Sequence, residues 1–158
     1  MELFIQNMNE EFAREVLVWK YNPPYDFYNS EFTKEELQER LNGTYFAIVN
    51  ETEELYGFFC IGESAQVPKG IQLNIYIDGF VDMGLGMNPK LVGKGGGFEF
   101  CSFIVHYIEQ KFKEKPIRLT VAKFNHRAIH LYRKIGFIDK EEFETDFAEF
   151  ITMVKASN

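Results

Sequence analysis

The sequence holds little of what disulfide, metal and membrane proteins depend on. It has two cysteines, Cys60 and Cys101, and three histidines among 158 residues. Both thiols stand in apolar settings, far apart and without metal-ligand spacing, which favours buried reduced cysteines. No apolar run reaches the length of a membrane span, and the first residues show no basic-then-apolar signal pattern. We therefore expect a soluble cytoplasmic protein without a metal or a membrane partner.

Basic residues are also outnumbered. The chain has 17 Lys and Arg against 24 Asp and Glu, a net charge of −7 that argues against nucleic acid as a partner. No repeat, linker or low-complexity segment divides it. Its length, with 46% hydrophobic and 26% charged residues, predicts a single domain over residues 1–158.

Capping residues and apolar spacing predict the elements of the first half. In order they are a strand over Glu2 to Gln6, a helix capped by Asn9 and running to about Lys20, a break at Pro23-Pro24, a helix capped by Thr33 and ending near Asn42-Gly43, and a hairpin of strands Thr44 to Asn50 and Leu55 to Gly62.

The second half continues the alternation of strands and helices. We expect a strand that begins around Ile71, is interrupted near Asp78-Gly79 and continues from Phe80 to Asn88, a helix from about Gly96 to Lys113, a strand over Ile117 to Val121, a helix from Asn125 to Gly136, and strands Phe137 to Glu144 and Phe147 to Val154. This order predicts one α/β domain with a mixed sheet.

A glycine-rich loop stands between the strand that stops at Pro89 and the following helix. Four of the five residues from Gly93 to Gly97 are glycine, and Lys94 is the exception. Without Cβ atoms, backbone N–H groups can converge on a ligand, and a helix N-terminus adds a positive dipole end, which suits a pyrophosphate. A flexible connection is the alternative, because glycine clusters are common turn signals.

Two familiar phosphate loops do not fit this stretch. A Walker loop would need glycine at Asn88 and serine or threonine at Gly95. A Rossmann fingerprint would need glycine or alanine at Pro89 or Phe98. These spacings argue against a nucleoside triphosphatase and a dinucleotide dehydrogenase.

A second motif lies in Leu119 to Phe137, LTVAKFNHRAIHLYRKIGF. There Asn125, Ala128 and Tyr132 stand at i, i+3 and i+7 and share one helical face. Together with Leu85-Gly86-Met87-Asn88-Pro89 and the glycine loop, this motif resembles the GNAT superfamily of N-acetyltransferases, over most of the chain and in element order. The resemblance implies a mixed, mostly antiparallel sheet of six to seven strands, with a splayed central strand and flanking helices.

The resemblance also implies acetyl-CoA as cosubstrate. By position, the backbone of Leu85, Gly86 and Met87 would bind the pantetheine arm, and Asn125 matches the family's cofactor-contacting asparagine. The pyrophosphate would lie on the loop, formed by Gly93, Lys94, Gly95, Gly96, Gly97 and Phe98. Val92 stands where the family usually has Arg or Gln. That position contributes to phosphate binding mainly through its backbone, and Lys94 still provides a positive charge in the loop, so we expect cofactor binding to survive.

Two residues are candidates for the proton transfers. Tyr132 matches the family's general acid toward the leaving thiolate, and general acid help is worth about 10²–10⁴-fold; a core tyrosine is the alternative. Some members carry a glutamate base where this chain has Thr120. Asp82, an acid in an otherwise apolar strand, is our candidate base, with a structural hydrogen-bonding acid as an equal alternative and Asp78 as a poorer choice.

The acceptor is expected near Tyr25-Asp26-Phe27-Tyr28, where family members often line the pocket. We expect Tyr25, Phe27 and Tyr28 to contact substrate, with plain packing as the alternative. The predicted function is acetyl transfer from acetyl-CoA to a primary amine of a small molecule or peptide. A catalytically silent acyl-CoA-binding module that senses or regulates is the second hypothesis, and a homodimer is left open.

Overall fold

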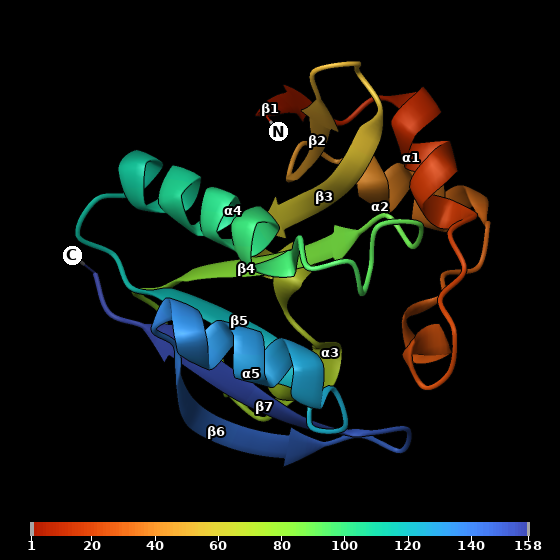
Figure 1. The fold of residues 1–158 in the computed structure, drawn as a ribbon. Helices are drawn as coiled ribbons and strands as arrows, with labels where there is room; N and C mark the ends of the chain where they lie inside the picture. Colours follow the sequence, from red (N-terminus) through yellow and green to blue (C-terminus); the bar gives the residue numbers. More distant parts are fainter. Residues whose placement is uncertain (1, 158) are drawn as a thin grey trace. The chain divides into compact units, whose positions relative to one another are not determined.

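The computed structural model describes residues 2–157, and Figure 1 shows its helices and strands. The first half contains β1 (Leu3–Asn7), α1 (Glu10–Leu17), the 3-10 turn η1 (Tyr25–Tyr28), α2 (Lys34–Arg40), β2 (Tyr45–Asn50) and β3 (Leu55–Ile61). The second half contains η2 (Gly62–Ala65), α3 (Pro68–Gln72), β4 (Val81–Met87), α4 (Gly97–Lys111), β5 (Ile117–Ala122), α5 (His126–Ile135), β6 (Ile138–Glu144) and β7 (Glu149–Lys155).

The strands form one sheet in the order β1-β2-β3-β4-β5-β7-β6. The β4–β5 pair is parallel, whereas β1–β2, β2–β3, β5–β7 and β6–β7 are antiparallel. This confirms the predicted α/β fold with a mixed, mostly antiparallel sheet of seven strands.

The chain forms two compact units. Unit 1 consists of Met1–Cys60 and Leu85–Gly97, and unit 2 consists of Ile61–Gly84 and Phe98–Asn158. The division falls inside β4, so one strand contributes its first half to unit 2 and its second half to unit 1. A single domain over residues 1–158 stays a prediction.

Unit 1 is built from two helices and the N-terminal hairpin. Asn9 caps α1 by accepting a hydrogen bond from the Phe12 N–H at 2.8 Å, and Thr33 caps α2 by accepting one from the Glu36 N–H at 3.1 Å. Val16 of α1 and Trp19, which follows the helix, then pack on β2 and β3 in a cluster with Ala47, Val49 and Leu55. Both predicted caps are thereby confirmed.

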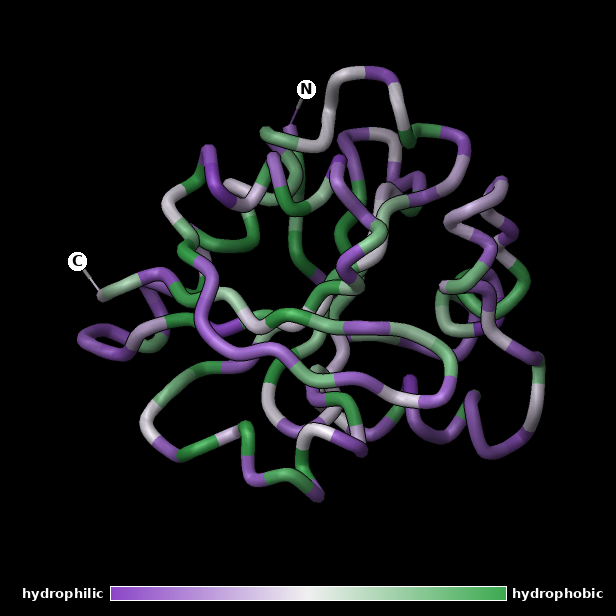
Figure 2. The backbone as a smooth tube through the Cα atoms, turned by 90° about the horizontal axis from the view of Figure 1, so that it is seen from below, coloured by the Kyte–Doolittle hydropathy of each residue, from purple (hydrophilic) through white to green (hydrophobic). Residues whose placement is uncertain are grey.

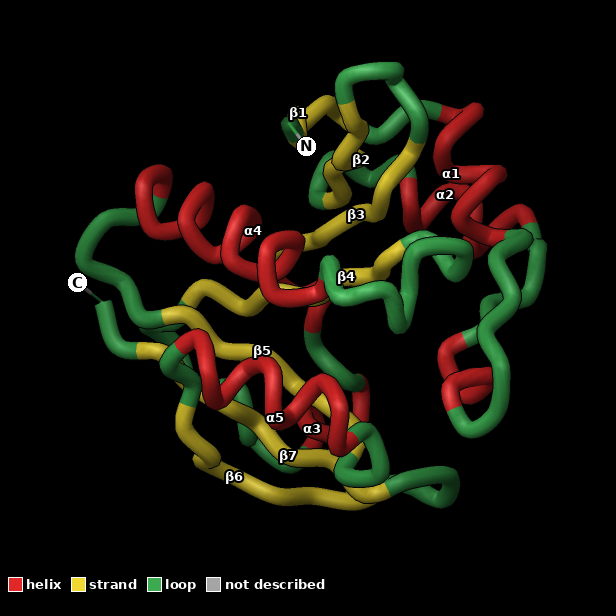
Figure 3. The backbone as a smooth tube through the Cα atoms, in the orientation of Figure 1, coloured by secondary structure: helices red, strands yellow, loops and turns green. Residues whose placement is uncertain are grey.

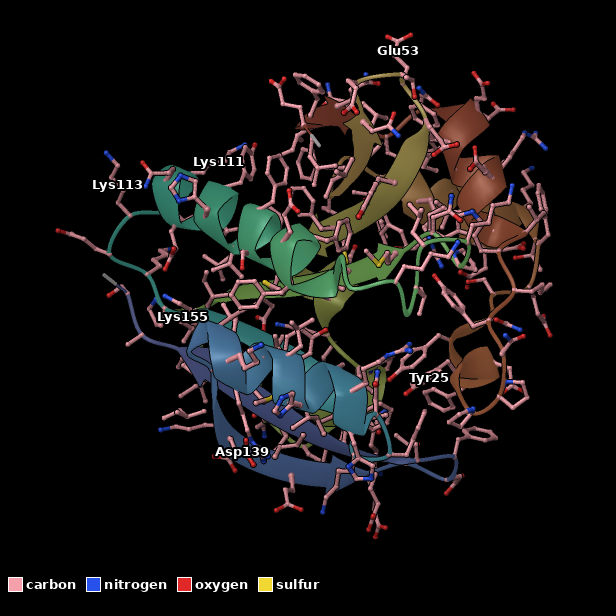
Figure 4. The ribbon with its side chains drawn as sticks, in the orientation of Figure 1. Tyr25, Glu53, Lys111, Lys113, Asp139 and Lys155 are labelled. Atoms are coloured by element: carbon pink, nitrogen blue, oxygen red, sulfur yellow. The ribbon has the colours of Figure 1, made fainter. Side chains whose placement is uncertain are left out.

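The predicted hairpin of β2 and β3 is also present. Tyr45 pairs with Cys60, and the side chain of Asn50 accepts hydrogen bonds from the Thr52 and Glu54 N–H groups in the connecting turn. Glu53 takes the left-handed conformation in this turn, with φ 63°, and Figure 4 shows its side chain at the outer end.

Unit 2 is organised around β5, all of which is buried except Thr120. It pairs with β4 from Val81↔Ile117 to Met83↔Leu119, and with β7 along its whole length. In Figures 1 and 3, helix α5 is drawn in front of β5 and β7 and runs roughly along them. The edge strand β6 is exposed apart from Phe143, and it is mostly hydrophilic in the view from below in Figure 2.

The expected strand from Ile71 was wrong. Helix α3 occupies Pro68–Gln72, where proline at a first helical position presets the backbone. Asn74 then takes φ 57°, which ends any extended run, and Ile71, Leu73 and Ile77 are exposed. The apolar alternation there therefore reflects a short helix and a loop, and β4 begins only at Val81.

Candidate cofactor and catalytic site

The glycine loop needs its glycines for two separate reasons. Gly93 and Gly95 take φ +78° and +85°, in the left-handed region that side chains other than glycine enter only at a cost. A Cβ atom on Gly96 would lie 2.6 Å from the Tyr56 hydroxyl oxygen. The loop then runs directly into α4, whose first backbone N–H groups have no partner within the helix. Such a loop can present several N–H groups to an anion.

The second half of β4 directs its backbone groups in a defined way. The Val81 N–H donates to the Pro116 carbonyl at 2.9 Å, and the Asn88 N–H donates to the Tyr56 carbonyl of β3 at 2.9 Å. Backbone groups of successive strand residues point to opposite edges. Leu85 and Met87 therefore direct their N–H and C=O groups away from β3, as the binding of a ligand's amide groups requires.

Gly86 allows a close approach on the face of unit 1 that carries the aromatic rings. A Cβ atom on this residue would overlap the ring of Phe58. That ring lies 6.2 Å from the ring of Trp19 and 6.0 Å from that of Tyr45, so it has aromatic neighbours on both sides. A side chain at position 86 would displace a packed ring.

Two residues that the sequence reasoning missed fix the end of β4. The buried Asn88 donates from its side chain to the Leu55 carbonyl at 3.0 Å and accepts from the Lys90 N–H at 3.0 Å. The Tyr21 hydroxyl donates to the Met87 carbonyl at 2.7 Å. The Asn-Pro pair is a turn signal that could have identified Asn88. Tyr21 gives no local signal, because it lies 66 residues from its partner.

Asp82, the candidate base, lies in a buried ion pair of unit 2. Its Oδ1 accepts from Arg118 Nε at 2.6 Å, and its Oδ2 accepts from Arg118 Nη2 at 2.9 Å and from Gln66 Nε2 at 2.9 Å. Both ion-pair side chains are nearly inaccessible, at 5% and 6% exposure. The Arg118 guanidinium also lies over the rings of Phe80 and Tyr76, at 4.4 and 5.1 Å. This geometry favours the structural role that was the alternative for Asp82.

The position aligned with the family's glutamate carries a pair of hydroxyl groups. The Thr120 and Tyr76 hydroxyl oxygens lie 2.7 Å apart, and Tyr76 also accepts from the Val67 N–H at 3.0 Å. Burial raises the pKa of Tyr76, so it stays protonated at neutral pH. This pair therefore supplies no carboxylate in place of the glutamate.

Helix α5 carries the second motif as predicted. Asn125 caps it, with the side chain accepting from the Ala128 N–H at 3.1 Å, and Gly136 ends it with φ 122°. Tyr132 is buried, and its ring meets that of Phe137 edge-on at 6.0 Å. The cofactor role of Asn125 and the proton transfer by Tyr132 stay predictions.

The expected acceptor segment forms η1 in unit 1. Phe27 and Tyr28 are exposed at 41% and 40%, with their rings edge-to-face at 5.2 Å, whereas Tyr25, labelled in Figure 4, is half-buried. Such exposure suits ligand contact better than core packing. Contact with substrate stays a prediction for all three residues.

Residues 2–157 lack two other kinds of functional feature. Within this range, no three His, Cys, Asp or Glu side chains are grouped so that they could hold a metal ion. No helix in the same range combines the length and apolar character that crossing a membrane requires.

Comparison with known proteins adds independent information. A family model described as the acetyltransferase (GNAT) family matches residues 7–137. Spermidine N(1)-acetyltransferase of Escherichia coli (strain K12) is 26% identical over 100 residues, which are 63% of this chain and 53% of that protein. The match therefore spans about half the length of this curated relative.

Solved structures share the fold at low sequence identity. An acetyltransferase (GNAT family) from Bacillus anthracis matches with TM-score 0.73 and 16% identity, covering 99% of this chain and 95% of that one. A spermidine N-acetyltransferase SpeG chimera from Vibrio cholerae and hSSAT matches with TM-score 0.70 and 19% identity, covering 99% and 96%. With the family model matching most of the chain, and with both motifs in its expected elements, the protein belongs to the GNAT family of acetyltransferases.

Proposed function

We propose that the protein is an acetyl-CoA-dependent N-acetyltransferase that acts on a primary amine. The observation that carries the proposal is the geometry of residues 85–97 in a member of this family. Strand backbone directed away from β3 leads into a loop whose glycines are required by conformation and by close approach. That sequence of features suits an extended ligand with amide groups at one end and phosphates at the other.

Different parts of residues 85–98 would bind different parts of acetyl-CoA. Leu85 would bind the pantetheine amides through its backbone N–H and C=O groups and Met87 through its N–H, with Gly86 between them. The pyrophosphate would be held by loop N–H groups and the start of α4, in residues Gly93, Lys94, Gly95, Gly96, Gly97 and Phe98. When bound, acetyl-CoA supplies an acetyl group activated as a thioester.

The chain must then align the amine, stabilise the developing oxyanion and move two protons. Backbone N–H groups in the second half of β4 can polarise the thioester carbonyl. As the amine nitrogen forms its bond to the acetyl carbon and the C–S bond breaks, the Tyr132 hydroxyl would give its proton to the departing sulfur. The amine proton would go to a base, and Asp82 stays our predicted base, acting directly or through water.

The acceptor class is a cationic amine. The curated relative is named a spermidine acetyltransferase, and the present chain has a net charge of −7, which favours approach of a polyamine. Tyr25, Phe27 and Tyr28 would contact its apolar stem. A cytoplasmic location and a homodimer also belong to the proposal, and cell fractionation and sedimentation of the purified protein test them.

A catalytically silent acyl-CoA-binding module is the second candidate. It is favoured by Thr120, because no carboxylate stands where some family members carry their base. Such a module would bind acetyl-CoA but release no thiol with any amine.

One pair of experiments separates the two candidates. We expect calorimetry to detect acetyl-CoA binding, and thiol release to appear in a panel of amines that includes spermidine. Tyr132→Phe should lower kcat by at least about a hundredfold with the acetyl-CoA Kd unchanged, because general acid help is lost. Tyr107→Phe, which removes a hydroxyl group from α4, is the matched control and should keep full activity. Turnover that Tyr132→Phe leaves unchanged would refute the proposed acid, and binding without turnover would favour the module.

A further inference from the structure

Tyr21 connects two parts of unit 1: η1, which is proposed to contact the acceptor amine, and the end of β4, which is proposed to bind the pantetheine arm. It follows α1 and packs against the apolar cluster of that helix and the β2–β3 hairpin. From there its hydroxyl reaches the Met87 carbonyl at 2.7 Å. Burial raises the pKa of Tyr21, so the hydroxyl stays a donor throughout the neutral range.

The hydrogen bond from Tyr21 completes the fixing of one peptide unit. The carbonyl of Met87 accepts from Tyr21, and the N–H on the same peptide unit, that of Asn88, donates to the Tyr56 carbonyl at 2.9 Å. With both polar atoms bonded, the peptide plane has one orientation. The N–H of Met87, on the edge away from β3, belongs to the preceding peptide unit, which joins this fixed plane at the Met87 Cα and is restrained through it.

Tyr21 is also hydrogen-bonded towards η1, the segment where the amine acceptor is expected. Its N–H donates to the side chain of Asn29 at 2.8 Å, and the Asn29 N–H donates to the Asp26 carbonyl of η1 at 3.0 Å. A continuous chain of hydrogen bonds therefore runs from η1 through Asn29 and Tyr21 to Met87. Every member of it belongs to unit 1.

We propose that Tyr21 is a positioning residue that presents the Met87 end of β4 to the pantetheine arm, and that Asn29 makes this depend on η1. The proposal rests on the proposed function, since it assumes that β4 binds pantetheine. Without the Tyr21 hydroxyl, the Met87 peptide would populate other orientations. The apparent Kd then rises in inverse proportion to the fraction that remains competent.

The test compares two ligands that differ in the pantetheine arm. For Tyr21→Phe we expect the calorimetric Kd of acetyl-CoA to rise by up to about fivefold, because one net hydrogen bond changes the ratio of competent to other orientations about fivefold. The Kd of adenosine 3′,5′-bisphosphate should not change, because this probe carries nucleotide phosphates without pantetheine. A merely structural role would lower thermal stability but would leave the ratio of the two constants at the wild-type value.

Further variants keep the test decisive. Tyr45→Phe removes a hydroxyl group from a buried tyrosine of unit 1, on β2, and should leave the ratio unchanged. Asn29→Ala should raise the ratio in the same direction as Tyr21→Phe, and Asn29→Asp, which keeps the acceptor oxygen, should restore it. If Tyr21→Phe does not fold, the ratios measured for Asn29→Ala and Asn29→Asp test the proposal instead.

Three outcomes would overturn the proposal. An unchanged ratio in both Tyr21→Phe and Asn29→Ala shows that the hydrogen bonds do not position the arm. Equal weakening of both ligands shows a general defect of the fold. Failure of the wild-type protein to bind acetyl-CoA overturns the proposed function as well, so the two failures are distinguishable.

Discussion

The buried pair of Arg118 and Asp82 gives the sharpest prediction about stability. Replacing Arg118 by methionine keeps an unbranched apolar side chain at this position but removes the guanidinium, which lies over the rings of Tyr76 and Phe80. The Asp82 carboxylate then loses two of its three described hydrogen bonds and keeps only that from Gln66. A carboxylate with 6% exposure cannot recover these bonds from water without opening the structure.

The expected loss is large. Removing one partner of a buried ion pair costs about 3–5 kcal/mol, out of about 5–15 kcal/mol for a typical domain. With a urea m-value of about 2 kcal/mol/M, the unfolding midpoint should fall by about 2 M. Circular dichroism in a urea titration measures it, since secondary structure in both units contributes to the signal.

Arg133→Met is the matched control in the same unit. Its partner is Asp139, labelled in Figure 4, and the two side chains are 57% and 41% exposed, so solvent screens this pair and it should contribute little to stability. A loss for Arg118→Met that does not exceed the loss for Arg133→Met would refute the assignment of a stabilising buried pair.

Replacing Asp82 also tests whether this carboxylate is the catalytic base. If Asp82 is the base, Asp82→Asn must lose the acidic limb of the pH–rate profile at temperatures where the variant is folded. An unchanged profile with reduced stability would leave the carboxylate only the structural role that Arg118 and Gln66 favour.

Two other predictions concern the glycine loop and a buried thiol. Gly96→Ala should weaken acetyl-CoA binding, because the new Cβ would clash with the Tyr56 hydroxyl. Gly43→Ala is the control: a Cβ there meets nothing within 4 Å, so it should add backbone strain without changing the affinity. Equal affinity in the two variants would contradict the assigned role of the loop. Burial raises the pKa of Cys101 to about 12, from 9.0. Since the unfolded chain loses this proton first, the free energy of unfolding should fall from pH 9 towards pH 12, by at most about 1.4 kcal/mol per pH unit. Cys101→Ala should show a shallower decline, and identical slopes would contradict the argument.

Features set by neighbouring residues could be predicted from the sequence. Asn9, Thr33 and Asn125 each cap a helix through a bond to an N–H three residues on, so the cap is visible in a short window. Helix α3 could not be predicted in this way, because the spacing of Ile71 and Leu73 fits an exposed strand as well as a short helix that begins at Pro68.

Long-range contacts gave no comparable signal. Arg118 occupies a polar position in an alternating strand, and its partner lies 36 residues away. Nothing in the local pattern distinguishes it from an exposed residue, yet it is only 4% exposed. The hydrogen bond of Tyr21 to β4 is hidden for the same reason. Local patterns thus predicted the two motifs but not the long-range contacts of Arg118 and Tyr21.

Mass spectrometry of the reaction products tests the central claim most directly. Wild-type protein incubated with acetyl-CoA and a panel of amines, spermidine among them, should yield an amine that carries one acetyl group on nitrogen. No such product should form without the protein or without acetyl-CoA, and Tyr132→Phe should form it at least about a hundredfold more slowly. Binding of acetyl-CoA with no acetylated amine in the whole panel would contradict the account and leave the silent acyl-CoA-binding module in its place.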